Sequence, residues 1–172
     1  LDARRKQLVD ELLAAGIEPW VCLYHWDLPQ ALQDRGGWAS RDSASWFADY
    51  ARVVASRLGD RVKRFATFNE PGVFTLFGYA FGWHPPAVDD AAQHHAAIHH
   101  VNLAHGAAID VLRAYLPGAS LGTICNLQPV RAVDPTEADR AAAGLLDEYW
   151  NRAFADPQIR GGEHLSPRFV RL

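Results

Sequence analysis

Hydrophobic positions along this chain recur at two spacings, which separate helical segments from short buried strands. Steps of three and four residues predict helices in four segments, which span about residues 8–16, 43–59, 90–115 and 136–154. Short apolar runs between the helices predict three strands, at residues 19–24, 61–68 and 121–125. The segments 25–43, 69–86 and 155–172 carry glycine and proline without a clear period and are predicted as loops.

Helices and strands therefore alternate, so the strands are expected to pair in parallel through right-handed helical crossovers. This order predicts an α/β fold, and both a doubly wound sheet and a (β/α)8 barrel satisfy it. No Gly-x-Gly-x-x-Gly motif follows any strand, which argues against the dinucleotide-binding form. Neither a linker nor a sequence repeat divides the chain, so residues 1–172 are expected to belong to one domain.

Polar and aromatic side chains come directly after each predicted strand. His25 and Trp26 follow the first strand, Asn69 and Glu70 follow the second, and Asn126 follows the third. Parallel strands place their C-terminal ends at one edge of the sheet, and the active sites of barrels and open α/β sheets lie at that edge. We therefore expect these five residues to converge.

Glu70 is the strongest catalytic candidate among them. It follows an apolar strand and has aromatic neighbours in sequence, such as Phe68 and Phe74. A carboxyl group in partly desolvated surroundings keeps its proton more readily and can serve as a general acid. The alternative is a surface glutamate at a strand end, paired with a nearby arginine.

The residues around Glu70 also allow two interpretations each. Asn69 can donate and accept hydrogen bonds beside Glu70, or it can be a turn residue that precedes Pro71. His25 and Trp26 can bind a sugar, the imidazole through a hydroxyl and the indole through its face. Their alternative role is a pair of loop residues packed on the edge of the sheet.

Composition narrows the class of partner. The 172 residues carry 17 basic and 20 acidic side chains, so the net charge of −3 provides no basic surface for nucleic acid or an anionic membrane. No apolar run approaches the roughly 18–20 residues that span a bilayer. Cys22 and Cys125 stand alone in apolar surroundings, which favours free thiols and a cytoplasmic, reducing compartment. The chain has no methionine, which suggests an interior piece or a processed product.

Several motifs occur in a fixed order along the chain. The three main ones are Leu23-Tyr24-His25-Trp26-Asp27-Leu28-Pro29-Gln30-Ala31-Leu32, Gly36-Gly37-Trp38 and Thr67-Phe68-Asn69-Glu70-Pro71. Supporting matches are Gly78-Tyr79, Gly82, His84-Pro85-Pro86, Leu103-Ala104-His105-Gly106, Asn126 and Phe154-Ala155-Asp156-Pro157. Together the motifs resemble glycoside hydrolase family 1, the family of β-glucosidases, β-galactosidases and their relatives.

The resemblance implies a (β/α)8 barrel that hydrolyses β-glycosides with retention of configuration. It assigns Glu70 as the general acid/base at the end of the fourth barrel strand and Asn69 as the partner of the sugar 2-hydroxyl. His25 and Trp26, after the third strand, match residues that hold the sugar, and Asn126, after the fifth, matches a polar residue that lines the site. The implied partner is a small-molecule β-glycoside, and neither a cofactor nor a resident metal is expected.

Other parts of the family's site have no counterpart in the chain. Retaining hydrolysis needs a second carboxylate as the nucleophile, and the family's Thr-Glu-Asn-Gly type of motif is absent. Glu163 is the loop candidate for this second carboxylate, and the family pattern gives it no role. Gly72 stands where many members carry a tryptophan that faces the leaving group. With about three of the eight strands, residues 1–172 are expected to form an incomplete barrel, covering strands 3 to 5, without activity of their own.

Two hypotheses of other classes stay open. A non-catalytic sugar-binding or structural fragment would bind glycosides weakly and never turn them over. A metal site is the other hypothesis, because His95 and His99 are four residues apart on a helix, within a run that also holds His94, His100 and His105. The chain has no His-Glu-x-x-His motif, so histidines on a helix surface are the simpler expectation.

Overall fold

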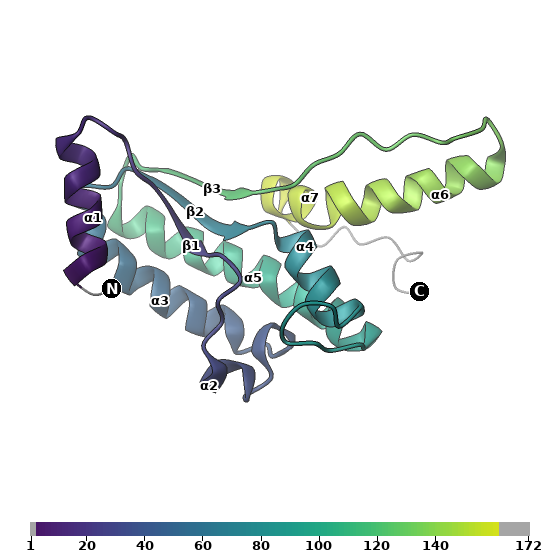
Figure 1. Ribbon diagram of the computed structural model, residues 1–172, viewed down its shortest axis with the longest axis horizontal. Helices are drawn as coiled ribbons and strands as arrows, with labels where there is room; N and C mark the ends of the chain where they lie inside the picture. The colour runs from purple at the N-terminus through teal and green to yellow at the C-terminus, as the bar shows by residue number, and fades with distance from the viewer. Residues whose placement is uncertain (1–2, 162–172) are drawn as a thin grey trace.

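A computed structural model describes residues 3–161 of the chain. Its centre is a parallel sheet of three strands in the order β1-β2-β3, which are β1 (Trp20–Tyr24), β2 (Arg64–Asn69) and β3 (Ser120–Ile124) (Figure 1). All three strands and their parallel pairing were predicted from the sequence. The prediction of a partial α/β barrel is confirmed, since β1 and β2 are each followed by helices that return the chain to the start of the next parallel strand.

Two long helices, α3 (Ser43–Leu58) and α5 (Ala91–Tyr115), lie side by side against one face of the sheet (Figure 1). The inward side of α3 carries Phe47, Ala51 and Val54. The buried residues of α5 include alanines, such as Ala97 and Ala104, between larger apolar residues. Small side chains let the two helices approach closely, and their apolar stripes repeat at the predicted spacing. The first helix, α1 (Ala3–Ala14), precedes β1.

An aromatic cluster fills the space between β1, β2, α3 and the segment after β2. Phe68 is fully buried and stacks on Phe47 with 4.5 Å between the ring centroids. Tyr24, Trp38 and Phe74 surround Phe68 in edge-on or tilted contacts, with centroids 5.2–6.1 Å from the Phe68 ring. These three rings also contact one another, with centroids 5.0–6.2 Å apart. These geometries are the favourable ones for aromatic pairs. Phe68, at the centre of the cluster, directly precedes Asn69 and Glu70 in sequence. The cluster therefore supports the end of β2.

The segments predicted as loops contain short helices, so that part of the prediction is wrong. Residues 25–43 include α2 (Gln30–Gln33) and the 3-10 turn η1 (Gly37–Ala39). Residues 69–86 include α4 (Pro71–Thr75) and the π-helical turn η2 (Leu76–Ala80). The elements α2 and η1 complete about one turn each, and α4 passes after five residues into the differently wound π-helical turn η2. Neither segment therefore keeps a regular hydrophobic period in the sequence. Pro71 at the first position of α4 suits a helix start, where its missing N–H costs nothing.

The last helical region also differs from the prediction. Three elements follow one another, α6 (Glu137–Asp147), the π-helical turn η3 (Glu148–Arg152) and α7 (Ala153–Arg160). Thr136 caps α6, because its hydroxyl accepts a hydrogen bond from the Asp139 backbone N–H at 3.1 Å. The helix continues beyond the predicted end at residue 154 and includes Pro157. Glu163 lies outside the described residues.

The two cysteines of the chain agree with the expectation from composition. Cys22 and Cys125 are free thiols, as predicted, and each is partly buried. No helix within residues 3–161 has both the length and the apolar character needed to cross a membrane.

Two of the helical histidines are buried, which corrects the expectation of a histidine surface on α5. His105 is 8% exposed and its Nδ1 lies 2.8 Å from the Thr67 hydroxyl on β2. His94 is 5% exposed and its Nε2 lies 3.0 Å from the Tyr149 hydroxyl on η3. Burial lowers the pKa of each ring to about 4, because the charged form loses its hydration. Both rings therefore stay neutral in the folded chain at neutral pH.

The free energy of unfolding should consequently fall as the pH drops from about 6.5 to about 4. In this window the unfolded chain binds protons on His94 and His105 while the folded chain does not, and each ring contributes up to about 3 kcal/mol. His105→Gln is expected to remove roughly half of the decrease, measured by urea unfolding at about pH 7 and about pH 5. The control is His25→Gln at an exposed position. An unchanged pH dependence in His105→Gln would contradict the assignment.

Candidate active site

The five candidate residues lie together at the C-terminal edge of the sheet. In the strand register Tyr24 pairs with Phe68, and Asn69 pairs with Ile124 across a local irregularity between β2 and β3. In this register His25 lies level with Asn69, and Glu70 lies level with Cys125, the residue before Asn126. This register brings His25, Glu70 and Asn126 to one end of the sheet, beside α4, η3 and α7 (Figure 1).

One half of the site joins β1 to β2 through direct contacts. The indole Nε1 of Trp26 donates a hydrogen bond of 2.9 Å to the backbone carbonyl of Asn69. The Asn69 side-chain amide lies 3.3 Å from the His25 Nε2. The backbone of Trp26 is left-handed, with φ of 73°, and the residue remains 37% exposed. Asn69 is thus part of a polar network rather than only a turn residue, and the imidazole beside it is exposed.

Glu70 occupies an unusual backbone position at the start of α4. Its φ of 49° and ψ of 61° place it in the left-handed region, which costs a residue with a side chain about 1 kcal/mol. Its backbone N–H donates a hydrogen bond of 2.7 Å to the carbonyl of Ile124, so β3 holds this conformation in place. Strained backbone of this kind is common at functional sites. Among the described residues the carboxylate makes no ion pair with an arginine, so the alternative interpretation of a paired surface glutamate has no support there.

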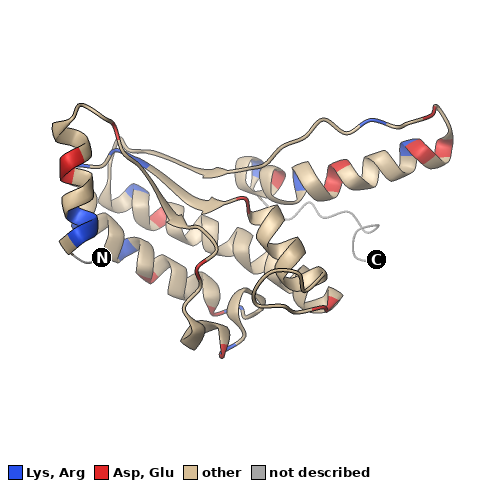
Figure 2. Ribbon diagram, viewed as in Figure 1, with Lys and Arg blue, Asp and Glu red and all other residues tan. Residues whose placement is uncertain are grey.

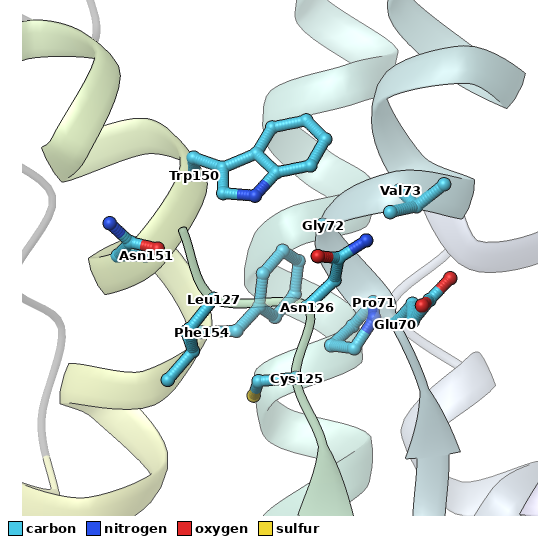
Figure 3. A pocket seen from close by; sticks show the side chains of 10 residues that line it. All are labelled: Glu70, Pro71, Gly72, Val73, Cys125, Asn126, Leu127, Trp150, Asn151 and Phe154. Atoms are coloured by element: carbon cyan, nitrogen blue, oxygen red, sulfur yellow. The ribbon is translucent and has the colours of Figure 1, made fainter. Parts of the chain in front are cut away.

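The other half of the site is a narrow crevice between Glu70 and the last helical region (Figure 3). Its volume of about 10 Å³ is room for about one water molecule. Glu70 and Gly72 form one side, Asn126 lies between, and Trp150 and Phe154 form the other side. A Cβ atom on Gly72 would have its nearest neighbours, on Trp150 and Phe154, at 3.9 Å. Gly72 therefore leaves this part of the crevice open.

Trp150 and Asn151 belong to this site although the sequence analysis did not select them. The Trp150 indole Nε1 is buried and has no hydrogen-bond partner among the described residues. Asn151 binds both backbone groups of Gln128, accepting from its N–H at 2.9 Å and donating to its carbonyl at 2.7 Å. These bonds anchor the segment that carries Asn126. No local signal could have identified either residue, since both lie in a predicted helix far from the strand ends in sequence.

No group of three or more potential metal ligands occurs within residues 3–161. His95 and His99 are partly buried, and each has partners in the structure. The described residues therefore provide no set of ligands for a metal site.

The comparisons with known proteins decide the family. Residues 5–168 match the family model described as "Glycosyl hydrolase family 1". The chain belongs to glycosyl hydrolase family 1. The resemblance inferred from the motifs is thereby confirmed, and it extends over nearly all of the sequence.

Relatives and solved structures in this family show where the chain fits. It is 46% identical over 156 residues to thermostable β-glucosidase B of Thermobispora bispora, covering 90% of this chain and 31% of that protein. It is 41% identical over 155 residues to a β-glucosidase of Agrobacterium sp., covering 90% and 34%. The structure matches the Thermotoga maritima β-glucosidase in complex with glucoimidazole with a TM-score of 0.89 at 37% identity, covering 96% of this chain and 37% of that one.

The chain therefore spans about a third of the length of the relatives it matches. These family 1 structures are (β/α)8 barrels, and the three-stranded parallel sheet is the corresponding part of such a barrel.

Proposed function

We propose that residues 1–172 supply the acid/base part of a β-glycoside hydrolase, with Glu70 as the general acid/base. The observation that carries the proposal is the position of Glu70, held at the C-terminal end of β2 between the His25–Asn69 pair and Asn126. The family supports it, since the relatives are named as β-glucosidases. Related structures are described as complexes with deoxynojirimycin, glucoimidazole and castanospermine, which supports a small-molecule glycoside as the ligand.

In this proposal each side chain acts on a defined atom of the substrate. The Glu70 carboxyl protonates the oxygen of the leaving group and then, as the carboxylate, takes a proton from the water that releases the sugar. The Asn69 amide binds the 2-hydroxyl, a contact that strengthens as the sugar ring approaches the oxocarbenium-like transition state. His25 and Trp26 hold the other side of the same sugar, and Asn126 binds near Glu70.

Retention of configuration requires a nucleophilic carboxylate about 5–5.5 Å from Glu70. Glu70 is the one acidic residue that lines the crevice among the described residues. We infer that the nucleophile lies outside this sequence and that the 172-residue chain alone does not hydrolyse glycosides. A chain with Glu70 and without a nucleophile equally suits the second candidate function, a fragment that binds sugars without turnover.

A chimeric barrel tests the proposal and separates the two functions. In it, this chain replaces the segment of the Thermotoga maritima β-glucosidase with which it aligns over 156 residues. The chimera is expected to hydrolyse aryl β-glucosides and to release the β-anomer first, as seen by proton NMR during the first turnovers, whereas the chain alone gives no product. A folded chimera that binds glucoimidazole without hydrolysis supports the binding function instead. Release of the α-anomer would contradict retention.

A further inference from the structure

A separate cavity lies between the end of β1, the segment that contains α2, and the first turns of α3. We call it the β1–α3 cavity. Its volume is about 280 Å³. An apolar cavity of roughly 150 Å³ in another protein holds benzene, so this one has room for a molecule with a single aromatic ring. Among the described residues, none lines both this cavity and the crevice at Glu70.

Apolar and aromatic side chains form most of the wall. Leu28, Pro29 and Leu32 come from the segment after β1, and Trp46 and Phe47 come from α3. Phe47 is 5% exposed and belongs to the buried aromatic cluster, so the cavity borders the core on this side. Such a wall favours a ligand with an aromatic ring, because burial of apolar area and ring-to-ring contacts both stabilise it.

One buried hydroxyl group in this wall has no partner. Ser43 is the first residue of α3 and is 2% exposed, and its Oγ makes no hydrogen bond with any described residue. Serine at the start of a helix commonly caps a backbone N–H group, but this hydroxyl does not. A buried hydroxyl without a partner destabilises the fold. Rotation about the Ser43 χ1 angle is the movement that would bring it to a ligand in the cavity.

A second hydroxyl group, that of Tyr24, belongs to the same wall. Burial raises the pKa of this phenol, and the neighbouring Trp38 indole N–H opposes the shift. The Tyr24 hydroxyl therefore keeps its proton at neutral pH and can donate a hydrogen bond. Two hydroxyl groups in an apolar wall suit a ligand that is mainly apolar and carries an oxygen atom.

The charges on the open side of the cavity balance each other. Arg5 and Asp27 both line it, are exposed, and carry opposite signs. Both act on the hydroxyl of Tyr50, whose pKa is raised by burial, lowered by Arg5 and raised by Asp27. Figure 2 shows basic and acidic residues together on α1 and on α3, the helices beside the cavity. This balance favours an uncharged ligand, because neither an anion nor a cation meets an excess of opposite charge.

We propose that the β1–α3 cavity binds an uncharged molecule with a single aromatic ring and a hydroxyl group, such as a phenol. The ring would pack among Leu28, Leu32 and Trp46, and the hydroxyl would form hydrogen bonds with Ser43 and Tyr24. Binding in this cavity requires neither Glu70 nor a nucleophile. Phenols are also the alcohols that aryl β-glycosides release on hydrolysis, and this link alone rests on the proposed function.

Titration of the 172-residue chain with p-cresol and with toluene tests the proposal, because the two molecules differ only in the hydroxyl group. Calorimetry measures the affinities, and NMR shows whether the indole N–H signals of Trp38 and Trp46 respond. Both molecules are expected to bind, p-cresol more tightly. Ser43→Ala is expected to weaken the affinity for p-cresol about tenfold and to leave that for toluene unchanged.

Two further variants serve as controls. Ser56→Ala removes an exposed serine of α3 that does not line the cavity, and both affinities should stay unchanged. Leu32→Trp fills the cavity and should abolish binding of both molecules. Thermal unfolding of each variant shows that it folds. If the chain alone does not unfold cooperatively, the titrations are made on the chimeric barrel carrying Glu70→Gln.

Failure of both molecules to bind would overturn the proposal, as would equal affinities of Ser43→Ala and the unchanged chain for p-cresol. Binding that persists in a folded Leu32→Trp variant would place the ligand elsewhere and would also overturn it. Loss of binding in the chimeric barrel would do the same, since polypeptide from outside this chain would then occupy the cavity. Failure of the chimera to hydrolyse aryl glucosides contradicts the proposed function alone, because occupancy of the cavity is measured without catalysis.

Discussion

Glu70→Gln in the chimeric barrel is expected to lower kcat/KM about a thousandfold for alkyl β-glucosides, whose leaving groups need protonation. For aryl glucosides with strongly acidic phenols as leaving groups, the rate of the first step should fall far less, because these leaving groups depart without help from an acid. Their glycosyl-enzyme should then accumulate, since the carboxylate that deprotonates water is also gone. Initial rates for a series of leaving groups, with burst kinetics for the most activated one, measure both effects.

A small anionic nucleophile separates loss of acid/base function from general damage to the site. Azide needs no base, so it should restore turnover of activated substrates by Glu70→Gln and yield the glycosyl azide. Asp27→Asn is the matched control, because Asp27 is an exposed carboxylate just after β1 at the same edge of the sheet. If all substrates lose activity equally and azide has no effect, Glu70 is not the acid/base.

Phe68→Ala is expected to reduce the free energy of unfolding by about 4 kcal/mol. The side chain is fully buried, and its removal leaves a cavity among Phe47, Trp38 and Phe74 that these rings cannot close without losing their mutual contacts. Urea unfolding followed by circular dichroism measures the loss. Tyr50→Ala removes a ring that is 41% exposed on α3 and should cost less than about 1 kcal/mol.

Equal losses for the two variants would show that the aromatic cluster carries no special share of the stability. A larger loss for Phe68→Ala would show that the buried cluster, which includes the residue before Asn69 on β2, contributes more to stability than an exposed ring does.

The long elements were predictable because their hydrophobic pattern extends over several turns or a full strand. The spacing in α3 and α5 and the apolar runs of β1, β2 and β3 all correspond to observed elements. Convergence at the C-terminal edge also follows from parallel pairing alone, and the motif around Glu70 predicted the family. The short helices α2 and α4 depend on packing against the rest of the fold, so the local pattern contains no sign of them.

Contacts between distant segments explain the remaining differences. His105 is buried because Thr67, on a strand 38 residues earlier, provides a partner for its ring. Trp150 reaches the crevice because the last helical region returns to the end of β2, beside Gly72. Neither partner can be recognised from the sequence around the residue itself. The side of the site formed by the last helix was therefore beyond local sequence reasoning.

The left-handed backbone of Glu70 has an evolutionary consequence. At this position glycine would adopt the same conformation without a steric penalty, so selection for stability alone favours loss of the carboxylate. A lineage that retains glutamate here pays in folding free energy for what the side chain does. Descendants released from that requirement would be expected to drift toward glycine or asparagine at residue 70, and the identity of this one residue would record whether the activity is still under selection.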